Sequence, residues 1–307
     1  MYIATHRKIF FWITGLILAG ALGAILVYGL PMGIDFTGGS LMQVSYPNGR
    51  PALADIQTEV ATVPLGSVSV IPLGTDGVSI RTRTMTPAEH AAVLSALSAS
   101  ASSDSTSSPQ ATELSYTSVG PSLGAQFASK ALWAIFAVIL AIVLFIAFAF
   151  RKVSRPVPSW VYGLAVIVIL VHDLVIPAGF FAIFAHFTGA QVDSLFVTAL
   201  LALLGYSVND TIIIFDRVRE HLAINEKTGH KEEFETTVGK SISETMTRSV
   251  NTSLTVVLAL GALVLLGAAA TRTFALVMLI GVIAGTYSSV LLAAPLLVPL
   301  SRYFVKK

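Results

Sequence analysis

The chain contains no cysteine among its 307 residues. That absence excludes disulfides, thiolate zinc sites and thiol nucleophiles. Charged residues are also scarce, at 12% of the sequence, and the formal net charge is only +2. No GxxxxGK[ST], HExxH or GxSxG motif occurs, and Ser-Val-Asn precedes Asp210 instead of the Gly-x-Gly of intramembrane aspartyl proteases. We therefore expect no nucleotide hydrolysis, no protease activity, no cofactor, no metal site and no nucleic-acid partner.

Long apolar segments are what the sequence has instead. The mean hydropathy is +0.79, and six segments approach or exceed the roughly 20 apolar residues that cross a bilayer. They are residues 9–30, 131–150, 157–184, 194–215, 250–270 and 273–300. The first follows His6, Arg7 and Lys8 but is longer than the roughly 7 to 15 residues of a signal-peptide core. We therefore expect six transmembrane helices in contact with membrane lipids, the first one uncleaved.

Lysine and arginine placement predicts the orientation of these helices. Basic residues cluster at both termini, in the short segment 151–155 and in the loop 217–248. Because cytoplasmic loops carry the excess of Lys and Arg, both termini and that loop are predicted to be cytoplasmic. The sequence then divides into residues 1–30 with the first span, an outer domain at 31–128, and residues 129–307 with five more spans.

The outer segment shows the pattern of a small α/β domain. Strands are predicted at 67–71 and 78–84 from alternating hydrophobicity, and further strands at 40–46 and 112–119. Helices are predicted at 51–63 and from a Thr86–Glu89 capping box to about residue 98. The order βαββαβ favours a ferredoxin-like fold. A serine-rich tip at 100–108 has no assigned role.

Polar residues inside the fourth and fifth spans are the first candidate site. Asp210 lies in an apolar helix beside Ser207, Asn209 and Thr211. A charge at the membrane centre costs about 2.5 to 3.5 kcal/mol, so such residues usually have a function. On the fifth span, Arg248, Thr252 and Thr255 share one helix face. Asp210 and Arg248 are predicted to lie within reach of each other, either as an ion-coupling pair or as a structural ion pair.

The third span carries a second candidate at His172 and Asp173. Pro177 removes the N–H that would pair with the Asp173 carbonyl, so a polar niche is expected there. A relay role and a hydrogen-bonded kink are both consistent with the sequence. In the last span, Gly281 and Gly285 form a GxxxG pattern that predicts close helix packing. We expect Gly281 to lie against a partner chain.

Two further patterns are open to more than one interpretation. Gly33, Asp35, Phe36, Gly38 and Gly39 form a glycine-rich segment without the lysine of a P-loop, so a tight turn is predicted. In the 217–248 loop, apolar residues recur every four positions at Phe234, Val238, Ile242 and Met246. They predict either an amphipathic helix on the membrane surface or a solvated connector.

Four motifs give the chain a resemblance to a known family. They are GIDFTGGS (33–40), VHDLVIPAG (171–179), GYSVNDTIIIFDRVRE (205–220) and TRSVNTSLTVVLALGALVLLG (247–267). The chain resembles the SecF family, the smaller subunits of the SecDF protein-export factor in the RND superfamily. The resemblance places the family's membrane aspartate at Asp210 and its arginine at Arg248.

That resemblance implies an RND-type half in the bacterial inner membrane that pairs with a SecD-like subunit. It also implies coupling to H⁺ or Na⁺, work on exported polypeptides, and association with the SecYEG translocon and YajC. The alternatives are half of a small-molecule or lipid exporter and a purely structural assembly subunit. The small outer segment argues against an exporter, and a structural subunit would tolerate loss of the Asp210 charge.

Overall fold

The structure is a computed structural model that describes residues 2–47, 49–100, 111–151, 157–229 and 232–304. Within it the chain forms two compact units. We call residues 1–31 with 132–307 the helical unit, and residues 32–131 the sheet unit. Positions 101–108 of the predicted serine-rich tip lie outside the described residues.

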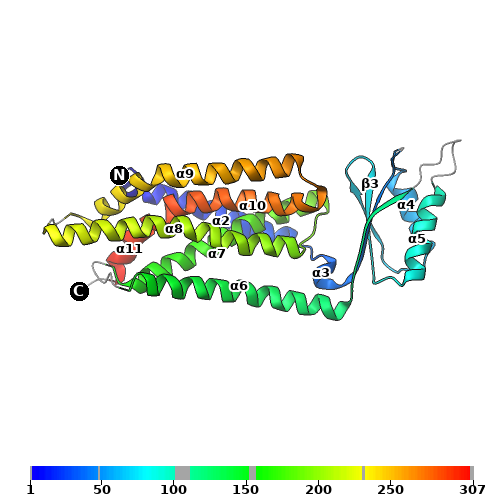
Figure 1. The fold of residues 1–307 in the computed structure, drawn as a ribbon, viewed down its shortest axis with the longest axis horizontal. Coiled ribbons are helices and arrows are strands. Elements are labelled where there is room, and N and C mark those ends of the chain that lie inside the picture. Colours follow the sequence, from blue (N-terminus) through cyan, green and yellow to red (C-terminus); the bar gives the residue numbers. More distant parts are fainter. Residues whose placement is uncertain (1, 48, 101–110, 152–156, 230–231, 305–307) are drawn as a thin grey trace. The chain divides into compact units, whose positions relative to one another are not determined.

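Long helices make up the helical unit (Figure 1). They are α1 (Tyr2–Thr5), α2 (Arg7–Tyr28), the later part of α6 (Pro121–Ala149), α7 (Ser159–Thr188), α8 (Ser194–Thr228), α9 (Phe234–Leu266), α10 (Ala269–Ser288), the π-helix η1 (Ser289–Ala293) and α11 (Ala294–Phe304). Six of the helical stretches are long and apolar enough to span a membrane, the last running from Thr271 to Phe304. The six predicted spans are therefore confirmed, although several helix ends differ.

The helix ends differ because hydropathy reports only the apolar part of a helix. Helix α6 begins at Pro121, ahead of the predicted start, and proline is favoured in the first turn of a helix. Helix α8 continues past the predicted end at 215 to Thr228, so the 217–248 segment is mostly helical. At 1.5 Å per residue its 35 residues extend about 52 Å, well beyond a hydrocarbon layer of about 30 Å.

The segment at 234–246 forms the predicted amphipathic helix. It is the first part of α9, which runs unbroken to Leu266. Val238 and Ile242 are buried in the core of the helical unit, and Phe234 and Met246 pack against the same core. The four-residue spacing therefore marks a face packed against neighbouring helices. The amphipathic helix is therefore confirmed and the solvated connector was wrong, while a position at the membrane surface stays a prediction.

Glycines allow two close helix contacts in this unit. A Cβ at Gly179 of α7 would lie 2.5 Å from Ala21 Cα of α2. One at Gly281 of α10 would lie 2.3 Å from Leu203 Cδ2 of α8, and Gly285 faces Ser207 on the same helix. The close packing predicted from GxxxG is confirmed, but it is internal to the chain. The expectation that Gly281 lies against a partner chain was therefore wrong, because this residue packs on Leu203 of the same chain.

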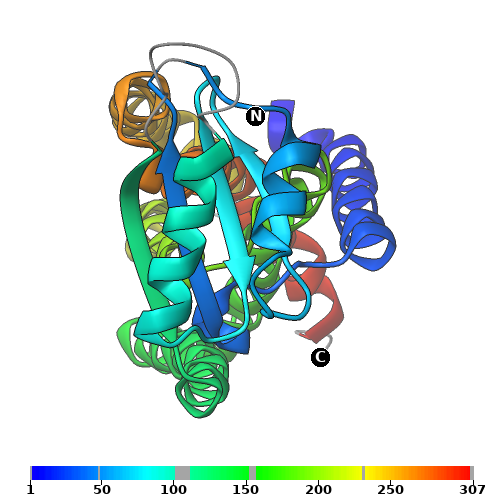
Figure 2. The same ribbon diagram turned by 90° about the vertical axis from the view of Figure 1, so that its right-hand side faces the viewer.

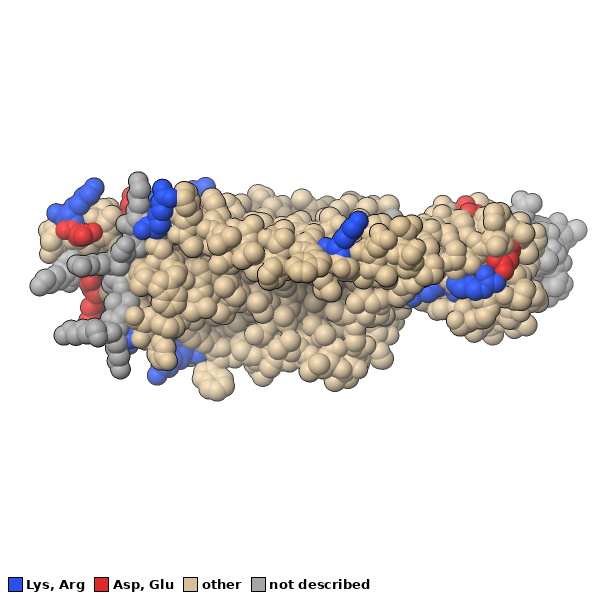
Figure 3. Space-filling view, turned by 90° about the horizontal axis from the view of Figure 1, so that it is seen from below, with Lys and Arg blue, Asp and Glu red and all other residues tan. Residues whose placement is uncertain are grey.

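Charged side chains of the helical unit gather at one end of it, on the face that Figure 3 shows. Ion pairs in the helical unit join Arg7 to Glu235 at 2.6 Å, Arg219 to Asp216 at 2.6 Å and Arg302 to Glu235 at 3.1 Å. Tan, uncharged side chains cover most of the rest of the unit's surface in this view. That distribution is typical of helices whose middle lies in lipid and whose end lies in water.

The sheet unit has the predicted order of elements. It contains α3 (Ile34–Thr37), β1 (Gly39–Ser45), α4 (Leu53–Val60), β2 (Ser69–Leu73), β3 (Gly77–Thr82), α5 (Pro87–Ser100), β4 (Thr112–Val119) and the start of α6. The sheet order is β2-β3-β1-β4 with every pairing antiparallel. Figure 2 shows α4 and α5 on one face of this sheet. The ferredoxin-like topology is confirmed.

The glycine-rich segment forms a tight joint at the start of β1. Gly38 and Gly39 have φ values of 76° and 128°, which side chains other than glycine rarely adopt. A Cβ at Gly38 would lie 2.7 Å from Pro121 Cα, and one at Gly39 would lie 2.7 Å from the Thr82 carbonyl oxygen. The backbone thus approaches α6 and β3 too closely for any other residue. The predicted turn contains one short helix, Ile34–Thr37.

The capping box at the start of α5 is confirmed. Glu89 Oε2 accepts from the Thr86 N–H at 2.8 Å, and the Glu89 N–H donates to Thr86 Oγ1 at 3.3 Å. Arg83 forms an ion pair with the same carboxylate. Hydrogen bonds from Arg83, and then from Thr86, lower the pKa of Glu89 from 4.5 to about 2. The ionised carboxylate therefore stabilises the folded unit.

This geometry predicts how the stability of the sheet unit depends on pH. Because the pKa of Glu89 is lowered by folding, its contribution is complete above about pH 4.5 and is lost as the pH falls towards 2. The protection factors of α5 amides in the full chain, which compare the measured exchange rate with the intrinsic rate at the same pH, should fall over that range. Glu89→Gln should exchange faster at neutral pH and respond less to acid. Asp55→Asn in α4 is the control and should follow wild type.

Candidate functional site

Asp210 lies in the buried face of α8. Its side chain is 4% exposed, and Oδ2 has no hydrogen-bond partner among the described residues. Helix α8 begins with a side-chain cap, in which the Phe196 N–H donates to Asp193 Oδ1 at 2.7 Å. A buried carboxylate oxygen without a partner is costly, because desolvation is not repaid by a hydrogen bond. Because burying this oxygen does not stabilise the fold, its presence indicates a functional role for Asp210.

Two residues of α9 act on Asp210. The Ser249 hydroxyl lies close to the carboxylate, yet its Oγ is also buried without a hydrogen bond of good geometry. Arg248 acts through its charge, and no nitrogen–oxygen distance within 4 Å joins it to Asp210 in the described residues. The predicted neighbours thus lie on adjacent helices without forming an ion pair. Arg248 itself is exposed on α9.

Asp173 of α7 is the centre of a second polar cluster and is completely buried. Its Oδ1 accepts from His172 Nδ1 and from Ser288 Oγ, both at 2.8 Å. Its Oδ2 accepts from Ser207 Oγ of α8. Three donors from α7, α8 and α10 thus surround one carboxylate. Asp173 joins the three helices, and both of its carboxylate oxygens are paired, in contrast to Asp210 Oδ2.

His172 extends this cluster to Tyr287 of α10. With Nδ1 donating to Asp173, Nε2 of a neutral imidazole accepts from the Tyr287 hydroxyl. Tyr287 was absent from our sequence prediction. Its signal is the run Thr-Tyr-Ser-Ser at 286–289, four hydroxyl side chains in succession within an apolar span. The hydroxyl groups of the fourth and fifth spans entered the prediction, but those of the last span did not.

Hydroxyl groups continue from Ser207 towards the π-helix. Thr211 Oγ1 and Ser289 Oγ lie 3.0 Å apart, so one hydroxyl donates to the other. The hydroxyl that accepts is free to donate weakly to the Ser207 carbonyl, which lies 3.4 Å from Thr211 Oγ1 and 3.5 Å from Ser289 Oγ. Ser289 is the first residue of η1, a rare geometry that is often found at functional sites. Because Asp210 is three residues from Ser207 on α8, it lies one turn from this cluster.

A third connection reaches α9. Tyr206 OH donates to Ser253 Oγ at 3.1 Å, and Thr286 Oγ1 donates to the same oxygen at 2.7 Å. The other predicted site residues are not brought into these contacts. Asn209 is exposed on α8, and Thr252 is exposed on α9, where its carbonyl accepts from Thr255 Oγ1 at 2.7 Å.

Among the described residues, no group of three His, Asp or Glu side chains is placed to hold a metal ion. The predicted glycine-rich segment at 33–39 belongs to the sheet unit, whereas the helices of this site belong to the helical unit.

Comparison with known proteins identifies similar sequences over most of the chain. Residues 99–303 match the family model described as protein export membrane protein SecD/SecF, C-terminal, and residues 23–46 match the SecD/SecF GG motif. The protein translocase subunit SecF of Thermobaculum terrenum is 36% identical over 309 residues, covering 96% of this chain and 92% of the relative. That of Anaerolinea thermophila is 34% identical over 294 residues, covering 95% and 91%.

A solved structure has the same fold. The crystal structure of SecDF from Thermus thermophilus, a translocon-associated membrane protein, matches with a TM-score of 0.82 at 27% identity. The match covers 98% of this chain and 39% of the SecDF chain. The chain thus spans about two-fifths of the length of that protein.

Proposed function

The chain belongs to the SecF family of protein translocase subunits, and from that premise we propose that Asp210 couples protein export to proton movement. Family membership makes it a multi-pass membrane protein and a transport component of protein export. It does not support the small-molecule exporter alternative. The observation that carries the proposal is the buried, unpartnered Oδ2 of Asp210 beside Ser249 and within the field of Arg248.

The coupling uses a competition between burial and a neighbouring positive charge. Burial favours the neutral form of a carboxyl group, whereas a guanidinium nearby favours the ionised form. A movement of α9 relative to α8 changes the distance between Arg248 and Asp210. It thereby favours uptake of the ion when the two are apart and release when they are close. One charge moving through 100 mV supplies about 2.3 kcal/mol, enough to bias a conformational equilibrium.

A proton fits the surroundings of Asp210 better than a sodium ion. Hard metal cations such as calcium and magnesium are bound by several oxygen ligands, and we apply the same requirement to sodium. Among the described residues, Asp210 Oδ2 has no hydrogen-bond partner, and the nearby Ser249 hydroxyl makes no hydrogen bond of good geometry. A carboxyl group carries a proton without further ligands, so we assign H⁺ as the coupling ion.

Asp173 and His172 have a positioning role in this proposal. Asp173 already accepts hydrogen bonds from His172, Ser207 and Ser288, so its carboxylate is fixed between three helices. Ser207 is held by that contact one turn from Asp210. The cluster therefore fixes the wall of the site, while α9, with Ser249 and Arg248, is the element that moves.

A SecD-like subunit is the partner we propose, and the exposed polar face of α9 is where it contacts this chain. Arg248, Asn251, Thr252 and Thr255 are exposed along one helix face. Exposure of this face to lipid would be unfavourable, since arginine at the membrane centre costs about 2.5 to 3.5 kcal/mol. The SecYEG translocon, YajC and exported polypeptides are the further partners that the family implies.

A cross-linking experiment tests this partnership. A photo-crosslinking residue at Thr252 in native membranes should join the chain to a SecD-like protein that also co-purifies with it. The same residue at Leu16, which is 76% exposed on the apolar α2, is the control and should cross-link much less. A Thr252 adduct with lipid alone would contradict both the surface and the partner.

The sidedness that we propose is cytoplasmic for both termini and for the α8–α9 connection, and external for the sheet unit. Because the chain has no cysteine, single cysteines report it cleanly. Thr228→Cys at the end of α8 should react with an impermeant maleimide only from the cytoplasmic side, and Thr62→Cys only from outside. Labelling of both from one side would reverse the assignment.

A further inference from the structure

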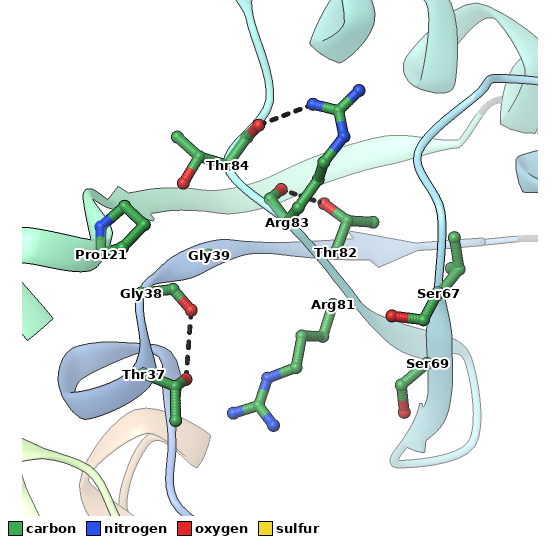
Figure 4. A pocket seen from close by; sticks show the side chains of 11 residues that line it. Thr37, Gly38, Gly39, Ser67, Ser69, Arg81, Thr82, Arg83, Thr84 and Pro121 are labelled. Carbon is green, nitrogen blue, oxygen red and sulfur yellow. Dashed lines mark hydrogen bonds between the residues drawn. The ribbon is translucent and has the colours of Figure 1, made fainter.

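The sheet unit contains a hollow of about 670 Å³ at one end of the sheet (Figure 4). Its wall includes Thr37 and Gly38 of the glycine-rich joint, Ser67 and Ser69 around the start of β2, and Arg81 of β3. Its volume lies within the range of sites that hold small ligands, about 300 to 1,000 Å³. The contacts of the glycine-rich joint and of the Thr86–Glu89 capping box do not require a hollow at this place.

The hollow lies beyond the point where the pairing of β2 with β3 ends. Strand β2 pairs with β3 only as far as Ser69 opposite Arg81, whereas β1 continues to pair with β3 at Thr82. Residues on both sides of the gap, Ser67 on one and Thr84 on the other, line the hollow. An extended chain entering such a gap meets backbone groups suited to strand-like hydrogen bonds.

Arg81 supplies a positive charge that forms no ion pair with a carboxylate among the described residues. Its Nη2 donates only to the Met32 carbonyl at 3.3 Å, and its buried Nε has no partner among the described residues. Burial lowers the pKa of Arg81, but a guanidinium stays charged at neutral pH. No Asp or Glu is among the described residues that line the hollow.

The neighbouring Arg83 shows the contrast. Its guanidinium is paired with Glu89 and donates to the Thr84 and Pro64 carbonyls at 2.9 and 3.1 Å. In Figure 4 the Arg81 and Arg83 side chains extend in opposite directions. Arg81 is therefore the lining cation whose hydrogen-bonding capacity is left for a ligand.

We propose that this hollow binds a carboxylate carried by an extended polypeptide segment, with Arg81 as its anchor. The planar guanidinium matches a carboxylate with two parallel hydrogen bonds. The Thr37, Ser67 and Ser69 hydroxyls and the parted strand edges supply donors and acceptors for the adjoining peptide groups. That the polypeptide is one in export rests on the proposed function, while the carboxylate preference rests on the hollow alone.

Peptide binding to the full chain in detergent tests the proposal. The probe is a short fluorescent peptide with one glutamate, and its twin carries glutamine in that position. Fluorescence anisotropy should show tighter binding of the glutamate peptide to the wild-type protein. Arg81→Gln should weaken it about tenfold or more, which corresponds to about 1.4 kcal/mol, and should leave the glutamine twin unaffected. Arg81→Lys should give an intermediate loss, because it keeps the charge but not the fork.

Arg50→Gln is the matched control. Arg50 belongs to the same unit and donates to the Gly74 and Gly77 carbonyls, away from the hollow. It should bind the glutamate peptide as the wild type does. Equal binding of both peptides, or no effect of Arg81→Gln, would overturn the proposal. Full competition by acetate at the peptide's own concentration would show a free-anion site and overturn the polypeptide assignment. No ion gradient is involved, so either failure leaves the role of Asp210 untouched.

Discussion

Asp210→Asn is expected to yield a folded, membrane-inserted subunit that has lost gradient-driven export. Asparagine has nearly the size and polarity of aspartate but cannot ionise, so it cannot take up and release a proton. Removing an unpartnered buried charge should leave stability unchanged or slightly raised. Cells with this variant as their only copy should accumulate unexported precursor proteins to the level of cells without the subunit.

Two further variants serve as comparisons for Asp210→Asn. Asn209→Ala changes the exposed neighbour on the same helix and should export as wild type does. Arg248→Lys keeps a positive charge but lacks the planar guanidinium, so partial export is expected. Normal export with Asp210→Asn, in cells with normal amounts of the protein, would assign Asp210 a structural role.

Asp173→Leu should have the largest effect on stability. It removes the acceptor for His172, Ser207 and Ser288. The His172 Nδ1 and Ser207 donors are left buried without this partner, whereas Ser288 Oγ keeps the Gly285 carbonyl at 3.1 Å. Each unsatisfied group costs about 1 to 3 kcal/mol, so with two such groups the free energy of unfolding should fall by about 2 to 6 kcal/mol. The measurement is unfolding of the purified protein in mixed micelles with increasing denaturing detergent.

Asp173→Asn separates hydrogen bonding from charge. Its amide oxygen still accepts, and the Ser207 hydroxyl can rotate to accept from the amide nitrogen, so the loss should be about 1 kcal/mol. Tyr287→Phe removes only the contact to His172 Nε2 and should cost a similar amount. If Asp173→Leu were as stable as wild type, the cluster would not hold the three helices together.

Elements whose signal lies within one segment could be predicted from the sequence. Apolar length indicated six spans, and alternation with the Thr86–Glu89 box indicated the ferredoxin-like unit. The extent of α6 and α9 could not be predicted in this way, because their polar turns carry no hydropathy signal. Phe234, Val238, Ile242 and Met246 had the right period, but only the structure shows that they face the core.

The candidate site was only partly predictable for a related reason. Asp173 and His172 stand out as polar residues in an apolar span. Their donors, however, come from α8 and α10, distant in sequence, and serine and tyrosine are common in membrane helices. The separation of Arg248 from Asp210 depends on how α9 packs on α8, which helix-face arguments do not determine. The link between Asp210 and ion movement stays a prediction.

The central claim is tested most directly by export into vesicles containing the translocon and the full complex under an imposed gradient. With wild-type protein, a pH gradient should stimulate export and a sodium gradient at equal pH should not. With Asp210→Asn, the pH gradient should give no stimulation while basal export is unchanged. Stimulation of the Asp210→Asn complex equal to that of wild type would contradict proton coupling at Asp210.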